Sequence, residues 1–400
     1  MQIMRPLAAS CCLLIIVAWV GTRPFYQEAI QSSSERQITQ GVDTLGKIDS
    51  LVFAAIRKRA FPGASVAVGY RGQIVKLAGY GNYSYGTHKA VSPESPFDLA
   101  SLTKVVATTT AAMQLYEAGR IDLNATVHSY LPEFAQNGKQ DVTIRHLLTH
   151  TSGLQPFIFF HQIDITDRET VVDSIYALAL NTPPGKEYRY SDFSMIVLAF
   201  VIERITGQDF GTYAREYIFE PLGMYATGFR EPGVPDPEVV PTEMDDYFRF
   251  RLVQGEVHDE TAWILGGDAG HAGLFSTAAD LARFATMLTQ QGQANGGQFL
   301  QPETIRLFTT AVDTSSHTRA LGWDTRSKDE EASAGVLFGP RSFGHTGFTG
   351  TSIWIDPDAE LFVILLTNRV FPRRENYKYV KVRPAVADAA YEAILGRPAH

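Results

Sequence analysis

Apolar and polar residues alternate in two stretches of the chain, one near each end. Residues 64–81 (ASVAVGYRGQIVKLAGYG) alternate on both sides of Arg71-Gly72, a dipeptide that fits a hairpin turn. Residues 351–369 (TSIWIDPDAELFVILLTNR) form two apolar runs separated by the turn sequence Asp-Pro-Asp. A period of two residues is typical of β-strands, so we expect a pair of strands in each stretch.

The long stretch between these strands has mostly helical periodicity. Proline and glycine interrupt it at 132, 183–185, 221–223 and 232–241, and we expect further helices over about 46–59 and 383–397. Strands at both ends with helices between them do not follow a strand–helix–strand alternation, which disfavours a parallel sheet. The pattern predicts an α+β fold, with one antiparallel sheet from the two ends of the chain, flanked by helices, and an inserted, mainly helical lobe.

Hydropathy divides the chain into three parts. Arg5 precedes the uncharged residues 7–20, and this run is shorter than the ~20 residues of a membrane span. We therefore expect residues 1–22 to be a signal peptide or an N-terminal membrane anchor, followed by a polar linker over 23–45. This beginning predicts export, to the bacterial periplasm or to the outer face of the cytoplasmic membrane.

The remainder, residues 46–400, is expected to form one folded domain. Its sheet lobe would come from about 46–100 and 311–400, and its helical lobe from about 101–310. A hydrophobic content of 45% is sufficient for a substantial core in a chain of this length.

Composition excludes several kinds of function. A net charge of −8 argues against a nucleic-acid partner. Both cysteines, Cys11 and Cys12, lie in the first twenty residues, so the folded domain has no disulfide, thiolate nucleophile or cysteine metal site. The sequence has no P-loop and no G-x-G-x-x-G motif, and we expect no cofactor and no metal.

Lys104 is unusual for its surroundings. Between Asp98 and Glu117 it is the only charged residue in an otherwise apolar or small stretch, and lysine is almost never fully buried without a partner or a task. In a helix that begins at Ser101, Lys104 lies one turn along, within reach of the serine hydroxyl. If desolvation lowers its pKa, this lysine can act as the base that activates the serine. In the alternative interpretation, Ser101 only caps the helix and Lys104 extends to the surface.

Two further motifs supply the groups that a serine–lysine hydrolase needs. Tyr190-Ser191-Asp192 opens a predicted helix, and His345-Thr346-Gly347 leads into a predicted strand. In this order, Ser-x-x-Lys, Tyr-Ser-Asp and His-Thr-Gly resemble the three motifs of the serine β-lactamase and penicillin-binding-protein superfamily. The phrases HLLTHTSGL (146–154), EVHDETAW (256–263) and GHAGLFSTAADLA (270–282) extend the resemblance, particularly to penicillin-binding proteins of the 4B type, over about 46–400.

The resemblance implies a β-lactamase/transpeptidase-like fold and a reaction through a serine acyl-enzyme. Carried over to this sequence, Ser101 is the nucleophile, Lys104 is a base and Tyr190 is the second proton carrier. His345 would belong to the catalytic group, on the strand that lines the cleft.

The resemblance also implies an oxyanion hole and a set of substrate contacts. The backbone N–H groups of Ser101 and Phe348 would form the oxyanion hole, in which one donor is typically worth about 3 kcal/mol of transition-state stabilisation. The substrate would contact Asp192, Thr346 and Gly347.

Two residues depart from the common motifs. Asp192 stands where the superfamily often has asparagine, and an ionised carboxylate only accepts hydrogen bonds. It also has a structural interpretation, as an acid in the first turn of a helix over 191–205 with Ser191 as its cap. His345 stands where lysine is common, and a neutral imidazole attracts a carboxylate less than lysine does, although a protonated one would help.

The activity that best fits is a D-alanyl-D-alanine carboxypeptidase-like peptidase of the cell envelope. A β-lactamase-like carboxylesterase on small esters is the alternative, and a penicillin-recognising protein with little turnover is a third reading. The expected partner is a small-molecule or peptidoglycan-peptide substrate, with membrane attachment through residues 7–20 and no nucleic acid.

A metal hydrolase is the rival interpretation from another class. His146 and His150 have the i, i+4 spacing of zinc ligands, and the His-Asp-Glu run at 258–260 could add more. However, Leu147 stands where a zinc protease needs glutamate. A second His-x-Gly motif, at 271–273, precedes a capped helix start rather than a strand, and we interpret it as a loop near the cleft.

Overall fold

The computed structural model describes residues 45–312, 319–327 and 333–396. The expected signal peptide or anchor, at 1–22, and residues 23–44 of the expected linker lie outside the described residues. Within the described ranges, no helix combines the length and the apolar character needed to cross a bilayer.

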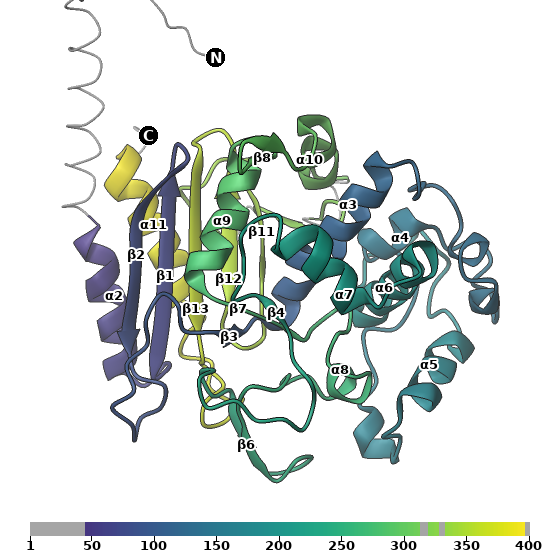
Figure 1. The fold of residues 1–400 in the computed structure, drawn as a ribbon, viewed down its shortest axis with the longest axis horizontal. Helices are drawn as coiled ribbons and strands as arrows, with labels where there is room; N and C mark the ends of the chain where they lie inside the picture. Colours follow the sequence, from purple (N-terminus) through teal and green to yellow (C-terminus); the bar gives the residue numbers. More distant parts are fainter. Residues whose placement is uncertain (1–44, 313–318, 328–332, 397–400) are drawn as a thin grey trace, which may run out of the picture. The chain divides into compact units, whose positions relative to one another are not determined.

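A six-stranded antiparallel sheet brings together strands from both ends of the domain (Figure 1). Its order is β10-β11-β12-β13-β1-β2, so β1 (Gly63–Tyr70) pairs with both β2 (Gln73–Gly81) and β13 (Leu361–Thr367). The other strands are β10 (Asp324–Thr325), β11 (Phe343–Thr346) and β12 (Ser352–Asp356). The two predicted strand pairs and the antiparallel sheet are confirmed.

Helices cover both faces of this sheet, and alternate residues of its interior strand β1 point to opposite faces. Val66 packs in an apolar cluster with α2 (Gly46–Arg57) and α11 (Val382–Leu395). Its neighbour Ala67 belongs to the second cluster, which includes α9 (Ala278–Thr289). The predictions of helices near 46–59 and 383–397 are confirmed, whereas α9, from the expected helical lobe, packs on the sheet.

The helical lobe is held together by the second cluster. Its longest helix, α6, is apolar around nearly its whole circumference and is buried over most of its length. The α-helices of the lobe are α3 (Thr110–Glu117), α4 (Ile144–Leu148), α5 (Arg168–Ala177), α6 (Asp192–Thr206), α7 (Phe210–Ala214), α8 (Glu260–Ile264) and α10 (Pro302–Thr309).

Short elements complete the described fold. One small sheet has the order β3 (Phe97–Asp98), β7 (Leu274–Ser276) and β4 (Gly228–Phe229), and two hairpins pair β5 (Glu243–Asp245) with β6 (Arg251–Val253) and β8 (Gln293–Ala294) with β9 (Gly297–Gln298). Single turns of 3₁₀-helix lie at Val127–Ser129, Pro132–Phe134 and Phe160–Ile163, and a π-helical turn lies at Arg215–Phe219.

The segment expected to be one helix from Ser101 differs in its first turns. It begins as a 3₁₀-helix, Ala100–Leu102, widens to a π-helix, Lys104–Thr109, and only then continues as α3. The hydroxyl of Thr110 donates to the carbonyl of Val105, five residues earlier, at 2.9 Å, which supports the wide turn. Such π turns are frequent at functional sites.

Candidate active site

The turn that carries Ser101 is held by a buried carboxylate. Ala100, just before it, has a left-handed φ of 47°, a conformation that a residue with a Cβ adopts only when its surroundings impose it. Oδ1 of Asp98 accepts from the N–H of Ala100 at 2.8 Å, and Oδ2 accepts from the N–H of His258 at 2.7 Å. Asp98 therefore ties the serine turn to the segment that begins at His258.

The ammonium of Lys104 is fully buried and lies close to several oxygen atoms. Nζ lies 2.9 Å from Oγ of Ser101, 2.9 Å from the carbonyl oxygen of His271 and 2.8 Å from Oδ1 of Asp192. The carbonyl and the carboxylate can only accept, so they fix two of the N–H bonds. The third position faces Ser101, where a proton can pass between the hydroxyl and the amine.

The pKa of Lys104 departs from the sequence-based expectation. Burial alone would lower it, but the charge of Asp192 and the hydrogen bonds of Asp192 and Tyr190 raise the pKa of Lys104 above its ordinary value. The condition stated above, a pKa lowered by desolvation, is not met in the resting site, because an opposite charge in direct contact outweighs burial. In the resting site Lys104 and Asp192 form an ammonium–carboxylate pair.

Tyr190 lies between two cations and two imidazole rings. Nζ of Lys104 and Cζ of Arg319 are each 5.1 Å from the centre of its ring. The rings of His150 and His345 lie 4.5 Å and 6.0 Å away, centre to centre. Tyr190 therefore lies next to Lys104, the lysine that contacts Ser101.

His345 is buried, and its hydrogen bonds define a neutral ring. Nδ1 lies 2.8 Å from the carbonyl oxygen of Thr346, which can only accept, and Nε2 lies 3.2 Å from Nη1 of Arg319, which can only donate. Burial, together with the charges of Arg319 and Lys104, holds the pKa of His345 well below its usual range. The positive charge beside this motif therefore belongs to Arg319, which sequence reasoning missed because it lies in none of the three motifs.

The loop after β11 packs against the serine turn. The hydroxyl of Thr349 donates to the carbonyl of Asp98 at 2.7 Å, and that of Thr351 donates to the carbonyl of Leu99 at 2.9 Å. Gly347 fits here because a Cβ would lie 2.3 Å from the oxygen of Leu99.

The two N–H groups expected to form the oxyanion hole belong to residues that line the same cleft, Ser101 and Phe348. Within the described residues, neither N–H has a protein acceptor.

A cleft of about 500 Å³ opens in front of Ser101, which lines it together with Tyr190, Asp192 and Phe348. Lys104, His345, Thr346 and Gly347 are not among its lining residues. One wall is apolar and the other polar. The apolar wall consists of Pro156, Phe157, Ile158, Phe159, Phe193 and Ile196, and the polar wall consists of His258, Asp259, Glu260, Thr261, His271 and Arg374.

The polar wall contains ion pairs that the sequence analysis did not foresee. Nη2 of Arg374 lies 2.6 Å from Glu243 and 2.9 Å from Glu260, and Nε2 of His258 lies 2.8 Å from Glu243. Nε2 of His271 lies 2.9 Å from Asp259, and this loop borders the cleft as expected. The expectation that no strand follows it is wrong, because β7 begins at Leu274, before α9.

The histidines of the metal interpretation have structural partners. Nδ1 of His146 accepts from the N–H of Thr143 at 3.2 Å, and this bond is part of the N-terminal cap of α4. Nδ1 of His150 accepts from the N–H of Ser191 at 3.2 Å. Ser191 caps α6 as predicted, since its hydroxyl accepts from the N–H of Ser194. Asp192 lies in the first turn of α6, as its structural interpretation expected, and its carboxylate also pairs with Lys104, which the sequence analysis did not foresee.

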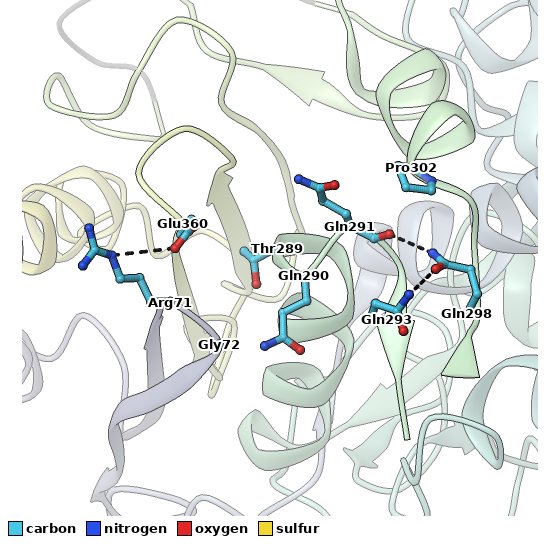
Figure 2. A pocket seen from close by; sticks show the side chains of 9 residues that line it. All are labelled: Arg71, Gly72, Thr289, Gln290, Gln291, Gln293, Gln298, Pro302 and Glu360. Atoms are coloured by element: carbon cyan, nitrogen blue, oxygen red, sulfur yellow. Dashed lines mark hydrogen bonds and ion pairs between the residues drawn. The ribbon is translucent and has the colours of Figure 1, made fainter. Parts of the chain in front are cut away.

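A second hollow of about 330 Å³ lies at the β1–β2 turn and the end of α9, as Figure 2 shows. It is lined by Arg71, Gly72, Thr289, Gln290, Gln291, Gln293, Gln298, Pro302 and Glu360. It shares no lining residue with the cleft at Ser101. The side-chain amide of Gln293 donates to that of Gln298, which in turn donates to the carbonyl of Gln291.

Known proteins resemble this chain in sequence. A family model described as "Beta-lactamase" matches residues 38–387. A Bacillus subtilis protein named "N-acetylmuramyl-L-alanine amidase" is 31% identical over 362 residues, which cover 81% of this chain and 81% of the relative. An Escherichia coli K12 protein named "Putative D-alanyl-D-alanine carboxypeptidase" is 30% identical over 299 residues, which cover 68% of this chain and 69% of the relative.

Solved structures resemble it in fold. The structure titled "EstCE1, a hydrolase with promiscuous acyltransferase activity" superposes with a TM-score of 0.71 at 24% identity, covering 88% of this chain and 99% of the other. An octameric penicillin-binding protein homologue from Pyrococcus abyssi gives a TM-score of 0.69 at 22% identity, covering 88% and 77%. At these identities the likeness shows the fold alone, and this fold is the one that the motifs implied.

Proposed function

The chain belongs to the β-lactamase family and is a serine hydrolase, and on this basis we propose that it is a carboxypeptidase that removes the C-terminal residue from D-alanyl-D-alanine peptides of the cell envelope. The observation that carries the proposal is the contact of 2.9 Å between Lys104 and Ser101 at the base of the cleft.

In the proposed reaction Oγ of Ser101 attacks the carbonyl carbon of the scissile amide. The proton of Ser101 enters the hydrogen-bonded group of Lys104, Tyr190 and Asp192, and the carbonyl electron pair moves onto oxygen, facing the N–H groups of Ser101 and Phe348. When the tetrahedral intermediate collapses, the C–N bond breaks and the same proton passes to the leaving nitrogen. Water then attacks the ester carbonyl and gives one proton to the same group. The bond between the carbonyl carbon and Oγ of Ser101 breaks, that proton returns to Oγ, and the shortened peptide leaves.

Arg319 supports a substrate with a free carboxylate. A leaving D-alanine carries a negative charge next to its nitrogen, and the guanidinium of Arg319, which also lies 3.7 Å from Asp324, is a cation beside both His345 and Tyr190. We expect Arg319→Gln to raise KM severalfold for a peptide that ends in a free carboxylate. The same peptide with an amidated C-terminus is the control, and equal losses on both peptides would argue against this role.

Three probes test the proposal together. Pure protein is mixed with labelled penicillin, with a D-Ala-D-Ala peptide and with a short-chain nitrophenyl ester, and mass spectrometry locates the adduct. We expect an adduct on Ser101 that Ser101→Ala does not form, together with release of D-alanine from the peptide. Hydrolysis by Ser101→Ala at the wild-type rate would contradict the mechanism. A stable penicillin adduct without turnover of the other two probes would instead favour a penicillin-recognising protein.

An esterase is the second candidate, because one wall of the cleft is apolar. Phe157 and Phe159 are 52% and 45% exposed although they are large and apolar, and their rings lie 4.9 Å apart at the rim. If esters are the substrates, Phe159→Ala should lower kcat/KM more for hexanoate than for acetate nitrophenyl esters. If peptides are the substrates, the variant should change kcat/KM by the same factor for both esters.

A peptidoglycan substrate requires export. The relatives named as carboxypeptidase and amidase support a cell-envelope location, and residues 7–20 would serve as the export signal or as a membrane attachment. Fractionation of cells that express the full chain, compared with a chain that begins at residue 23, tests both: we expect export only of the full chain.

A further inference from the structure

Two arginines are buried behind the loop that follows β11. Arg369 is 1% exposed and Arg383 is 9% exposed. Among the residues that the structure describes, neither forms an ion pair with a carboxylate. A buried cation without a counter-ion is costly, so these two side chains require an explanation.

Their donors bind carbonyl groups of this loop. Nη2 of Arg383 donates to the carbonyl oxygen of Gly347 at 2.6 Å and to that of Thr351 at 3.0 Å. Nε of Arg369 donates to the carbonyl oxygen of Phe348 at 2.7 Å. The two guanidinium groups therefore bind the carbonyl oxygens on both sides of Phe348, that of Gly347 before it and its own after it.

The contact of Arg383 acts on one particular peptide group. The carbonyl of Gly347 and the N–H of Phe348 belong to the same planar, trans peptide, in which the two point in opposite directions. A cation that holds the oxygen therefore fixes the N–H on the other side. It also polarises the peptide, which makes the N–H a stronger donor.

We propose that Arg383 is a positioning residue of the oxyanion hole, which acts through the Gly347–Phe348 peptide to orient and strengthen the N–H that receives the negative charge when Ser101 attacks. This inference rests on the proposed function, because it takes Ser101 as the nucleophile and Phe348 as an oxyanion donor. The charge develops only in the transition state, so Arg383 affects the rate of the chemical step rather than the binding of the substrate.

The surroundings of Phe348 keep this peptide in place. Cζ of Arg369 lies 4.3 Å from the centre of the Phe348 ring, and the ring of His258 stacks on it at 5.7 Å. Burial lowers the pKa of Arg383 to about 10, so its side chain remains charged at neutral pH.

Two substitutions of Arg383 and one matched control test the proposal. Arg383→Met removes the charge and keeps most of the volume, and Arg383→Lys keeps a charge with poorer geometry. Arg326→Met is the control, because Nη2 of Arg326 also donates to a carbonyl, that of Val336 at 2.8 Å, and lines no part of the cleft. Active sites are counted by stoichiometric labelling of Ser101 with a fluorophosphonate, and melting temperatures are recorded.

The readouts are kcat and KM on a nitrophenyl ester and the inhibition constant of a phenylboronic acid, which forms a tetrahedral adduct with a serine. For Arg383→Met we expect kcat per labelled site to fall about 10- to 100-fold, with KM changed less than about twofold and boronate affinity reduced by the same factor as kcat/KM. Arg383→Lys should recover part of both losses, and Arg326→Met should change neither.

The outcomes separate this inference from the proposed function. If Arg383→Met lowers only the melting temperature or the number of labelled sites, with normal kcat and boronate affinity per site, Arg383 is structural and the inference is wrong. If Arg383→Met does not fold, the same comparison is made with Arg383→Lys, for which unchanged kcat and boronate affinity are again the contrary result. If the wild type forms no Ser101 adduct with any probe, the proposed function itself has failed.

Discussion

Oδ1 of Asp192 and Nζ of Lys104 form an ion pair 2.8 Å long, and the same nitrogen lies 2.9 Å from Oγ of Ser101. The lysine is thus bonded at once to a permanent acceptor and to the serine that it is expected to activate. Where asparagine occupies the position of Asp192, the side chain brings no charge. In this protein the charge raises the pKa of Lys104, so the resting base is protonated.

Asp192→Asn should move the pH dependence of activity. The pKa of Lys104 is raised by Asp192, and a base works only after it has lost its proton. Removal of the carboxylate lowers that pKa, so the rise of kcat/KM with increasing pH should shift to lower pH. The measurement is a pH–rate profile of both proteins on a nitrophenyl ester. An unchanged profile would show that the pKa of Lys104 does not determine the rise of kcat/KM with pH.

Lys104→Gln should lower kcat by about 10²- to 10⁴-fold, because a positioned base contributes that much to proton transfer. Glutamine is one bond shorter than lysine and keeps a polar end, but it has no amine to accept the proton of Ser101. The exposed Lys58 provides the control, since Lys58→Gln removes the same charge elsewhere in the domain. Similar losses in the two variants, measured per folded protein, would argue against a catalytic amine.

Asp98→Asn should reduce both stability and rate. The two oxygens of Asp98 accept from the N–H groups of Ala100 and His258, and an asparagine has only one oxygen for these two donors. We expect the free energy of unfolding to fall by about 1–3 kcal/mol, and kcat to fall about 10- to 100-fold because the serine turn shifts.

The control for Asp98 is Asp167, which accepts from the N–H of Thr170 at 2.8 Å as the cap of α5 and lines no part of the cleft. Asp167→Asn should cost less than about 1 kcal/mol of stability, since asparagine is also a good cap. Its kcat should equal that of the wild type. Urea unfolding and single-turnover kinetics of the two variants provide the comparison, and a normal kcat in Asp98→Asn would refute the role of the turn.

Glu243→Gln should destabilise the protein in a pH-dependent way. Burial alone would raise the pKa of Glu243, but the hydrogen bonds and charges of His258 and Arg374 lower it below its usual value. Such a carboxylate adds stability above its unfolded pKa, and the gain disappears as the pH falls through its folded pKa. We expect a loss of about 3 kcal/mol at pH 7 that shrinks below about pH 4. Urea unfolding at several pH values measures this, and a loss independent of pH would be the contrary result.

Local sequence pattern was sufficient for much of the fold. The alternation around Arg71-Gly72 and around Asp-Pro-Asp predicted the strands that became β1, β2, β12 and β13, because a period of two residues is a property of the strand itself. The isolated charge of Lys104 likewise predicted a buried, engaged amine. The structure brings it to Ser101, Tyr190 and Asp192.

What the sequence could not provide depends on distances between remote residues. Burial lowers the pKa of Lys104 and the carboxylate of Asp192, 2.8 Å away, raises it. Which effect is larger depends on that distance, and only coordinates provide it. Arg319 and Arg383 lie outside all motifs, and a single arginine carries no local signal of what its guanidinium binds. The basic stretch at 371–384 has the composition of a solvated loop, yet the guanidinium groups of its Arg374 and Arg383 bind carboxylates and carbonyls.

The pairing of β1 with β13 has a consequence for biosynthesis. Ala64 in β1 lies opposite Thr367 in β13, so β1 obtains this neighbour only after the whole stretch between the two strands has been made. Closing so long a loop is entropically costly, and contacts of this kind slow folding. The sheet of a nascent chain with this topology therefore stays incomplete until β13 has been synthesised.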